Sequence, residues 1–359
     1  MKKTTTTVAL AIALVVALLA GCSAGAGSSG DTTATAAAAQ KAAGDDTSAV
    51  ASATGLEAVA TASEENIDTH DSPGDYVYDE ADVTEISLGA TITAEAILLA
   101  VPSHGFRAVL ESAREETDSA TPILSLAKGV EQETLMRMTE VAADVLPNHR
   151  VDRIGVLTGP NLAKEIMAGQ PAATVIAMQD ATAAASLQQV FINPRFRVYT
   201  NDDVVGSESA GALKNVMAIA AGMARGLCFG DNTMAMLITR ALAELTRLGV
   251  AMGGRPLTFA GLAGMGDLIA TCMSSQSRNQ TVGYGLGQGK KLDEIIAEMN
   301  MVAEGVKSTR GILELAKDYG VEMPIAEQVG RVLYDGADPA EAVATLMMRQ
   351  AKPEAHGIA

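Results

Sequence analysis

A lysine stands in an otherwise apolar and small-residue stretch, GALKNVMAIAAG, at residues 211–222. If the stretch is helical, the neighbours of Lys214 one turn away are Ala210, Met217 and Ala218. A lysine among them loses solvation of its ammonium group, so its pKa should fall toward neutrality and let it donate and accept protons at physiological pH. The alternative is a lysine that lies along a buried helix and reaches solvent at its edge.

A second cluster lies in GLAGMGDLIATCMSSQSRNQTVG, residues 261–283. Asp267 follows a glycine-rich turn, and Ser277, Arg278 and Asn279 come ten residues later at an expected helix start. A hydroxyl, a guanidinium and an amide beside free backbone N–H groups suit a phosphate dianion. The alternative is charge pairing between the arginine and a surface acid.

A third group follows two expected parallel strands. Lys128 stands in SLAKGVE, and Gly159, Asn161 and Ala163 stand in TGPNLA. Open α/β sheets bind ligands beyond the carboxyl ends of their strands. Glycine and asparagine at such places also serve turn geometry alone. We expect no metal site, because the cysteines beyond residue 22, Cys228 and Cys272, have no metal-ligand spacing.

These side chains must be positioned by helices and strands. The spacing of apolar residues predicts different elements in two parts of the chain. From residue 95 to 203, apolar runs of strand length such as AILLAV and TPILSL alternate with helical segments such as RAVLESAREE, which predicts β-α-β units with buried strands. From 204 to 352 all segments have helical spacing, separated by Gly and Pro. We therefore predict a partial α/β domain over 95–203 and an all-α domain over 204–352.

The first 94 residues have a different character. Residues 1–22 combine Lys2 and Lys3 with an apolar run and end in LAGC, which resembles a lipoprotein signal peptide with Cys22 as the lipidation site. The alternative is an ordinary signal peptide. Residues 23–73 predict a disordered acidic tether, and 74–94 a short strand remnant of a lipoprotein β domain. The leader predicts a membrane-anchored lipoprotein that faces outside.

The 359-residue chain has a net charge of -17. Its acidic residues are distributed unequally between the segment before residue 95 and the remainder. Residues 23–94 contain thirteen Asp or Glu and one Lys, too acidic and too poor in apolar residues to form a core. From residue 95 onward 30 acidic residues oppose 23 basic ones, which argues against a nucleic-acid partner.

From about residue 96 to 352 the chain resembles the bacterial NAD(P)-dependent glycerol-3-phosphate dehydrogenases. The shared motifs, in order, include VPSHGF, AKGVE, TGPNLAKEI, FRVYTNDDVVG, ALKNVMAIAAGM, GLAGMGDLIATC, SRNQTVG and VAEGVKST. The resemblance implies an incomplete Rossmann-like parallel sheet, followed by an all-helical substrate domain like the C-terminal domains of 6-phosphogluconate dehydrogenases.

The resemblance also implies chemistry and roles. The activity is NAD(P)H-dependent reduction of dihydroxyacetone phosphate to sn-glycerol 3-phosphate for phospholipid synthesis, in a cytoplasmic enzyme that can be a homodimer. Lys214 is implied as the general acid and base. The implied substrate contacts are Lys128, Gly159, Asn161, Asp267, Ser277, Arg278 and Asn279, and the implied cofactor contacts are Lys128, Ala163, Arg278, Val302 and Glu304.

One departure bears on the cofactor, NAD or NADP. The family begins with a strand, a G-x-G-x-x-G turn and a helix that hold the pyrophosphate. In this chain AGAGSSG, residues 24–30, is followed by a polar low-complexity tract instead of an apolar helix. We therefore expect an incomplete cofactor site, impaired activity and a chimera joined near residues 89–95. The alternative is a non-catalytic anchored lipoprotein, and the sequence leaves open whether the join is biological or an error of gene assembly.

Overall fold

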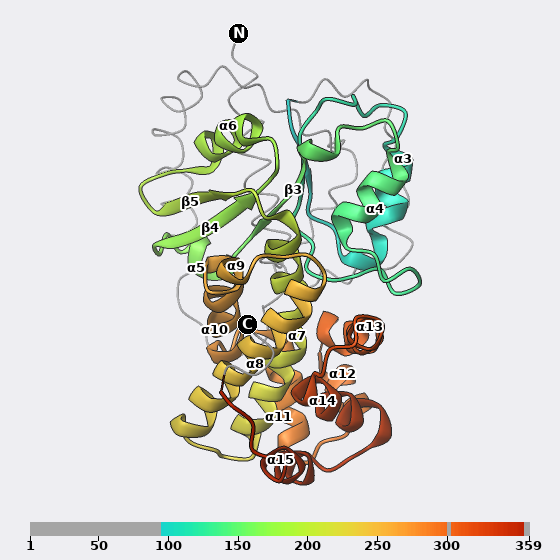
Figure 1. Ribbon diagram of the computed structural model, residues 1–359. Helices are drawn as coiled ribbons and strands as arrows, with labels where there is room; N and C mark the ends of the chain where they lie inside the picture. The colour runs from blue at the N-terminus through green and yellow to red at the C-terminus, as the bar shows by residue number, and fades with distance from the viewer. Residues whose placement is uncertain (1–94, 300–302, 355–359) are drawn as a thin grey trace.

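The structure is a computed structural model that describes residues 95–299 and 303–354. It contains a layered α/β part and a bundle of helices, joined by one long helix (Figure 1). The expected leader over 1–22, tether over 23–73 and strand remnant over 74–94 lie outside the described residues, as do Cys22 and Val302.

Five strands form one sheet in the order β1-β2-β3-β4-β5. The pairs β1–β2, β2–β3 and β4–β5 are parallel, whereas β3 and β4 are antiparallel, with Val156 opposite Ala177. The expected parallel sheet is therefore confirmed as a mostly parallel one, with β3–β4 as its one antiparallel pair. The strands are β1 Ile97–Leu99, β2 Ile123–Ser125, β3 Ile154–Thr158, β4 Ala172–Ala177 and β5 Phe196–Asn201.

Helices cover both faces of this sheet (Figure 1). On one face Phe106 and Leu110 of α3 and Met138 of α4 pack with Ile123 and Ile154 of the strands. On the other face α6 packs against β2 to β5. Burial on both faces explains why the strands read as continuous apolar runs. The helices are α3 Phe106–Ser112, α4 Met138–Val145, α5 Ala163–Met167 and α6 Ala181–Phe191, with 3₁₀ turns at Ser103–Gly105 and Val151–Arg153.

The helical part is built around α7, Val204–Gly226, which is buried along almost its whole length. A helix that is apolar or small on every side belongs in the centre of a bundle. The surrounding helices are α8 Asp231–Ala251, α9 Pro256–Phe259, α10 Asp267–Met273, α11 Arg278–Gly287, α12 Leu292–Glu298, α13 Glu304–Asp318, α14 Pro324–Asp335 and α15 Pro339–Met347.

A buried ion pair joins α7 to the α/β part. Glu208 of α7 accepts hydrogen bonds from the Arg137 guanidinium (2.8 Å) and from the backbone N–H (2.9 Å) and hydroxyl of Thr139. Burial raises the pKa of the Glu208 carboxyl, and Arg137 acts in the opposite direction. Because Arg137 and Thr139 lie at the start of α4, this contact fixes the sheet layer against the central helix.

The glycine-rich segment VGYGLGQGK forms the end of α11, which stops at Gly287, and the turn at Gln288 and Gly289 that follows it. The segment LTFAGLAGMGDLIATCM is divided into α9, a π-helical turn at Leu262–Gly266, and α10. By length and composition the described part of the chain has one segment apolar enough to cross a membrane, Pro256–Met273, and it contains the buried Asp267 that bonds Lys214.

The contact between α7 and α11 depends on glycine, which gives a testable expectation. A Cβ added at Gly283 would lie 2.0 Å from the carbonyl oxygen of Ile219. We expect Gly283→Ala to lower the free energy of unfolding by about 1–3 kcal/mol or more, because backbone atoms of α7 must move to admit the methyl group. Urea denaturation measures this, with Gly230→Ala, where a Cβ meets nothing within 4 Å, as the control. Equal midpoints for the two variants would contradict the close packing of these helices.

Candidate active site

The centre of the site is Lys214, which α7 holds in the interior. The residues one turn before Lys214 on its own helix, Ala210 and Gly211, are small, and its side chain reaches α10. Lys214 Nζ donates to Asp267 Oδ1 (2.5 Å) and to Thr271 Oγ1 (2.6 Å). These two acceptors fix the ammonium in one position.

Asp267 binds a second lysine on its other oxygen. Lys128 Nζ donates to Asp267 Oδ2 (2.7 Å) and to the Gly159 carbonyl (3.1 Å). The Asp267 side chain is buried, at 2% exposure, whereas Lys128 keeps 21%. One buried carboxylate thus serves two ammonium groups, and this three-residue cluster has a net charge of +1 that favours an anionic ligand.

The environment sets the protonation of Lys214. Its pKa is lowered from 10.5 to about 8, mainly because burial removes water from the ammonium. The charge of Asp267 opposes this shift, and the charge of Lys128 adds to it. The expected fall toward neutrality is confirmed, and the lysine can exchange a proton near physiological pH.

The turns after two strands position the remaining parts of this cluster. Lys128 follows β2 and Gly159 follows β3, as expected of ligand-binding turns in an open sheet. Gly159 has φ +139°, a conformation that side chains rarely adopt, and this turn presents its carbonyl to Lys128. Asn215 Nδ2 donates to the Lys128 carbonyl (3.2 Å), so α7 also holds the backbone of the lysine turn.

The start of α11 carries Ser277, Arg278 and Asn279, as the sequence indicated. The Ser277 hydroxyl is the N-cap and accepts from the Gln280 N–H (3.3 Å). Asn279 Oδ1 accepts from the Gly305 N–H (2.9 Å), which ties α11 to the start of α13. Ser277 thus caps the start of α11, and Asn279 holds the start of α13 against it.

Glu304 is the first residue of α13 and adds a carboxylate near the cationic groups. Burial raises its pKa, whereas the charges of Arg278, Lys214 and Lys128 and a hydrogen bond with the Ser103 backbone lower it. The structure thus brings Glu304 and Arg278 into one electrostatic neighbourhood with the Lys214 cluster. Ala163, a buried residue, is the first residue of α5.

Two buried polar atoms, one at the end of β3 and one in the turn after it, have no hydrogen-bond partner among the described residues. They are the hydroxyl of Thr158 and the amide oxygen of Asn161. The amide nitrogen of Asn161 is used, because it donates to Thr174 Oγ1 (2.9 Å). Unpaired buried polar atoms are costly and mark places where a ligand can supply the missing partner. Thr158 is the last residue of β3, and Asn161 lies in the turn whose Gly159 carbonyl accepts a hydrogen bond from Lys128.

Sequence reasoning missed two residues of the cluster. Thr271 lies four residues after Asp267, on the same face of α10, and Asn215 directly follows Lys214. The i, i+4 spacing of Asp267 and Thr271 was visible in the sequence, but nothing there showed that both face a lysine of another helix. Across residues 95–299 and 303–354 no group of three or more His, Cys, Asp or Glu is placed to hold a metal ion.

Two family models match the chain. The model described as NAD-dependent glycerol-3-phosphate dehydrogenase C-terminus matches residues 203–344, and the corresponding N-terminus model matches residues 22–184. The second match includes AGAGSSG and the residues expected to form a tether. The domain boundaries before residue 95 and the incompleteness of the cofactor site therefore stay predictions.

Curated relatives agree with these models. A protein of Sphingopyxis alaskensis named glycerol-3-phosphate dehydrogenase (NAD(P)+) 2 is 53% identical over 276 residues, which are 77% of this chain and 81% of that protein. A Mycobacterium avium protein of the same name, without the numeral, is 52% identical over 268 residues, 75% of this chain and 78% of that protein.

The described fold is also similar to a solved structure. The crystal structure of glycerol-3-phosphate dehydrogenase from Coxiella burnetii superposes with a TM-score of 0.68 at 38% sequence identity, and the match covers 71% of this chain and 78% of that one.

Proposed function

The chain belongs to the NAD-dependent glycerol-3-phosphate dehydrogenase family, and from this premise we propose that residues 95–354 carry the machinery that reduces dihydroxyacetone phosphate to sn-glycerol 3-phosphate. The observation that supports this most is the buried cluster of Lys214, Asp267 and Lys128. It combines a lysine poised to transfer protons with excess positive charge for a phosphate ester. The product would serve phospholipid synthesis.

Lys214 supplies the proton in this proposal. Two of its three N–H groups are used by Asp267 and Thr271, so one remains for the substrate oxygen. In the reduction it donates a proton to the carbonyl oxygen as that atom gains negative charge, and in the reverse direction it accepts the hydroxyl proton. Asp267 and Thr271 orient the ammonium, and Lys128 adds positive charge on the far side of Asp267.

The phosphate would be bound at the start of α11. Arg278 provides a guanidinium there, with Ser277 and Asn279 beside it, and a bidentate guanidinium suits a phosphate. Lys128, Gly159 and Asn161 complete the proposed substrate contacts from the sheet side. Substrate held at both ends in this way presents its central carbon in one orientation.

The described residues fit the reactive end of NAD or NADP. The unpaired hydroxyl of Thr158 and amide oxygen of Asn161 await partners, and Glu304 and Arg278 border the same cluster. The proposed contacts are Lys128, Ala163, Arg278, Val302 and Glu304. When bound, the nicotinamide supplies the hydride in the reduction. For the pyrophosphate end we propose an incomplete site, because the G-x-G-x-x-G turn lacks its helix in the sequence.

A grafted protein tests the proposed activity independently of residues 1–94. It joins residues 95–359 to the N-terminal segment of the Sphingopyxis alaskensis relative, which replaces residues 1–94. We expect it to oxidise NADH or NADPH when dihydroxyacetone phosphate is added, measured by absorbance. A folded graft that binds cofactor but reduces no dihydroxyacetone phosphate would contradict the proposed function.

The lowered pKa of Lys214 predicts opposite pH dependences for the two directions. The reduction needs the protonated lysine, so kcat/KM should fall as the pH rises above about 8. The oxidation needs the neutral lysine, so its kcat/KM should rise until about pH 8 and then level. Initial rates of the grafted protein in both directions between pH 6 and 10, as a range of roughly two units around this pKa, measure the profiles. Parallel profiles in the two directions would contradict the assignment.

A second candidate function rests on residues 1–94. The leader and the acidic segment support a membrane-anchored lipoprotein without catalysis, with lipid on Cys22, and a chain produced by fusion near residues 89–95. The family resemblance instead supports a cytoplasmic enzyme, which can be a homodimer. Globomycin-sensitive processing and mass spectrometry of Cys22 distinguish the two, since an unprocessed cytosolic chain excludes the anchor.

A further inference from the structure

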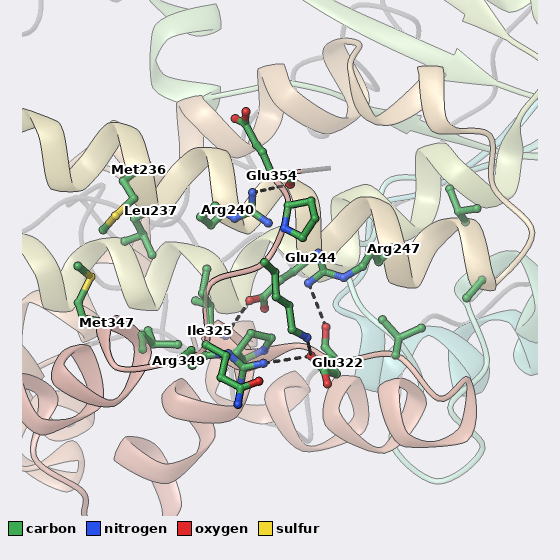
Figure 2. A pocket seen from close by; sticks show the side chains of 18 of the residues that line it. Met236, Leu237, Arg240, Glu244, Arg247, Glu322, Ile325, Met347, Arg349 and Glu354 are labelled. Carbon is green, nitrogen blue, oxygen red and sulfur yellow. Dashed lines mark hydrogen bonds and ion pairs between the residues drawn. The ribbon is translucent and has the colours of Figure 1, made fainter. Parts of the chain in front are cut away.

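A groove of about 910 Å³ lies on the helical part, between α8, the start of α14 and the segment that follows α15 (Figure 2). Lys128, Lys214 and Asp267 do not line it, so it is separate from the candidate active site. Its volume is in the range of small-molecule sites. Its walls combine apolar and cationic side chains.

One face of α8 forms a wall of the groove. Met236, Arg240, Glu244, Arg247 and Ala251 all line it. They follow one another at intervals of three or four residues, so they share a single face of the helix. This wall spans about 16 Å from Met236 to Arg247, at 1.5 Å per residue. The groove is therefore long enough for an extended ligand.

Four cationic side chains line the groove, against three carboxylates, those of Glu244, Glu322 and Glu354. Arg240 donates to the Glu354 carbonyl (3.0 Å) and Arg247 to the Glu322 carbonyl (3.1 Å). A carbonyl oxygen accepts a hydrogen bond but brings no negative charge. The Glu322 carboxylate serves both Arg349 (3.0 Å) and Lys352 (2.9 Å). An anion can therefore gain strong contacts here.

Glu244, at the base of this wall, does not compensate the cations fully. Its carboxylate accepts the Ile325 N–H (2.8 Å) and the Ala326 N–H (3.4 Å), so it is engaged at the start of α14. The residue is 2% exposed. Burial raises the pKa of its carboxyl to about 7, so part of the population is neutral at physiological pH.

The other end of the groove is apolar. Met236, Leu237 and Met347 lie together in Figure 2, and Arg247 and Glu322 lie at the opposite end. Met236 is 45% exposed and Met347 is 64% exposed. Exposed apolar surface that adjoins a groove marks binding sites, and methionine adapts to ligands of different shape.

We propose that this groove binds a single-chain anionic amphiphile, with its alkyl chain along Met236, Leu237 and Met347 and its anionic head group at Arg240 and Arg247. A simple inorganic anion would leave the methionines exposed. A second copy is disfavoured, because twofold pairing of the α8 faces near Glu244 places Arg240 of one copy beside Arg247 of the other. An anionic amphiphile covers the apolar end of the groove with its alkyl chain and pairs with the arginines through its head group.

Calorimetry of the purified full chain tests the proposal, with dodecyl phosphate below its micellar concentration as the probe. We expect saturation at one molecule per chain. Dodecyl maltoside, with the same chain and an uncharged head, and inorganic phosphate, with no chain, should each bind at least about tenfold more weakly. Arg240→Gln with Arg247→Gln should weaken dodecyl phosphate by a similar factor, and Met236→Ser should weaken it less. Arg114→Gln, an exposed arginine elsewhere, is the control.

Four results would overturn the proposal, given unchanged circular dichroism of the variants. They are equal affinity for dodecyl maltoside, equal affinity for inorganic phosphate, unchanged affinity in the double arginine variant, and binding to phosphatidylglycerol vesicles without binding of the monomeric probe. Lys214→Ala should retain full dodecyl phosphate affinity. The proposed groove and the proposed active site are therefore tested independently, and a negative result for one does not contradict the other.

Discussion

Lys214→Ala in the grafted protein is expected to lower kcat for dihydroxyacetone phosphate reduction by a factor of about 10² to 10⁴, the usual contribution of a positioned general acid. The physical reason is that no other described side chain donates from the same place. Lys214 is held between Asp267 and Thr271 (2.5 and 2.6 Å), and Lys128 approaches Asp267 from the other oxygen. Stopped-flow absorbance of NADPH measures the rate.

Two controls distinguish the loss of the proton donor from a general loss of folding in Lys214→Ala. Lys317→Ala removes an exposed lysine of α13 and should leave kcat unchanged. Added methylamine should restore part of the activity of Lys214→Ala, because the alanine leaves room for a small amine acid at the same position. Full activity of Lys214→Ala without amine would show that the proton comes from another group.

The second large effect concerns the cofactor. The chain with its own residues 1–94 is expected to bind NADH and NADPH orders of magnitude more weakly than the grafted protein and to show negligible reduction of dihydroxyacetone phosphate. A pyrophosphate cradle supplies several charge-assisted hydrogen bonds, each of about 1.5–3 kcal/mol, and every 1.4 kcal/mol is about tenfold in affinity. Calorimetry of both proteins with each nucleotide measures the difference.

The opposite result has a definite meaning. Micromolar affinity of the natural chain for NADPH would show that residues before 95 build the cradle, in keeping with the family match that begins at residue 22. Variants Gly25→Val and Gly27→Val would then locate it, because they should abolish the binding only if AGAGSSG approaches the pyrophosphate.

The sequence by itself determined the elements and their order. Continuous apolar runs predicted buried strands, and the expected helical segment RAVLESAREE, residues 107–116, overlaps α3. The motifs placed Lys214 on a helix and Ser277 at a helix start, which the structure confirms. These features are local, because periodicity, capping and solvation by near neighbours depend on residues a few positions apart.

Only the tertiary structure decided which of these side chains meet. The bond from Lys128 to Asp267 spans 139 residues, and the bond from Lys214 to Thr271 spans 57. The antiparallel pairing of β3 with β4 and the glycine contact between α7 and α11 also lie beyond local pattern. Charge, burial and packing across the chain fix these contacts, and burial in that setting lowers the pKa of Lys214 to about 8.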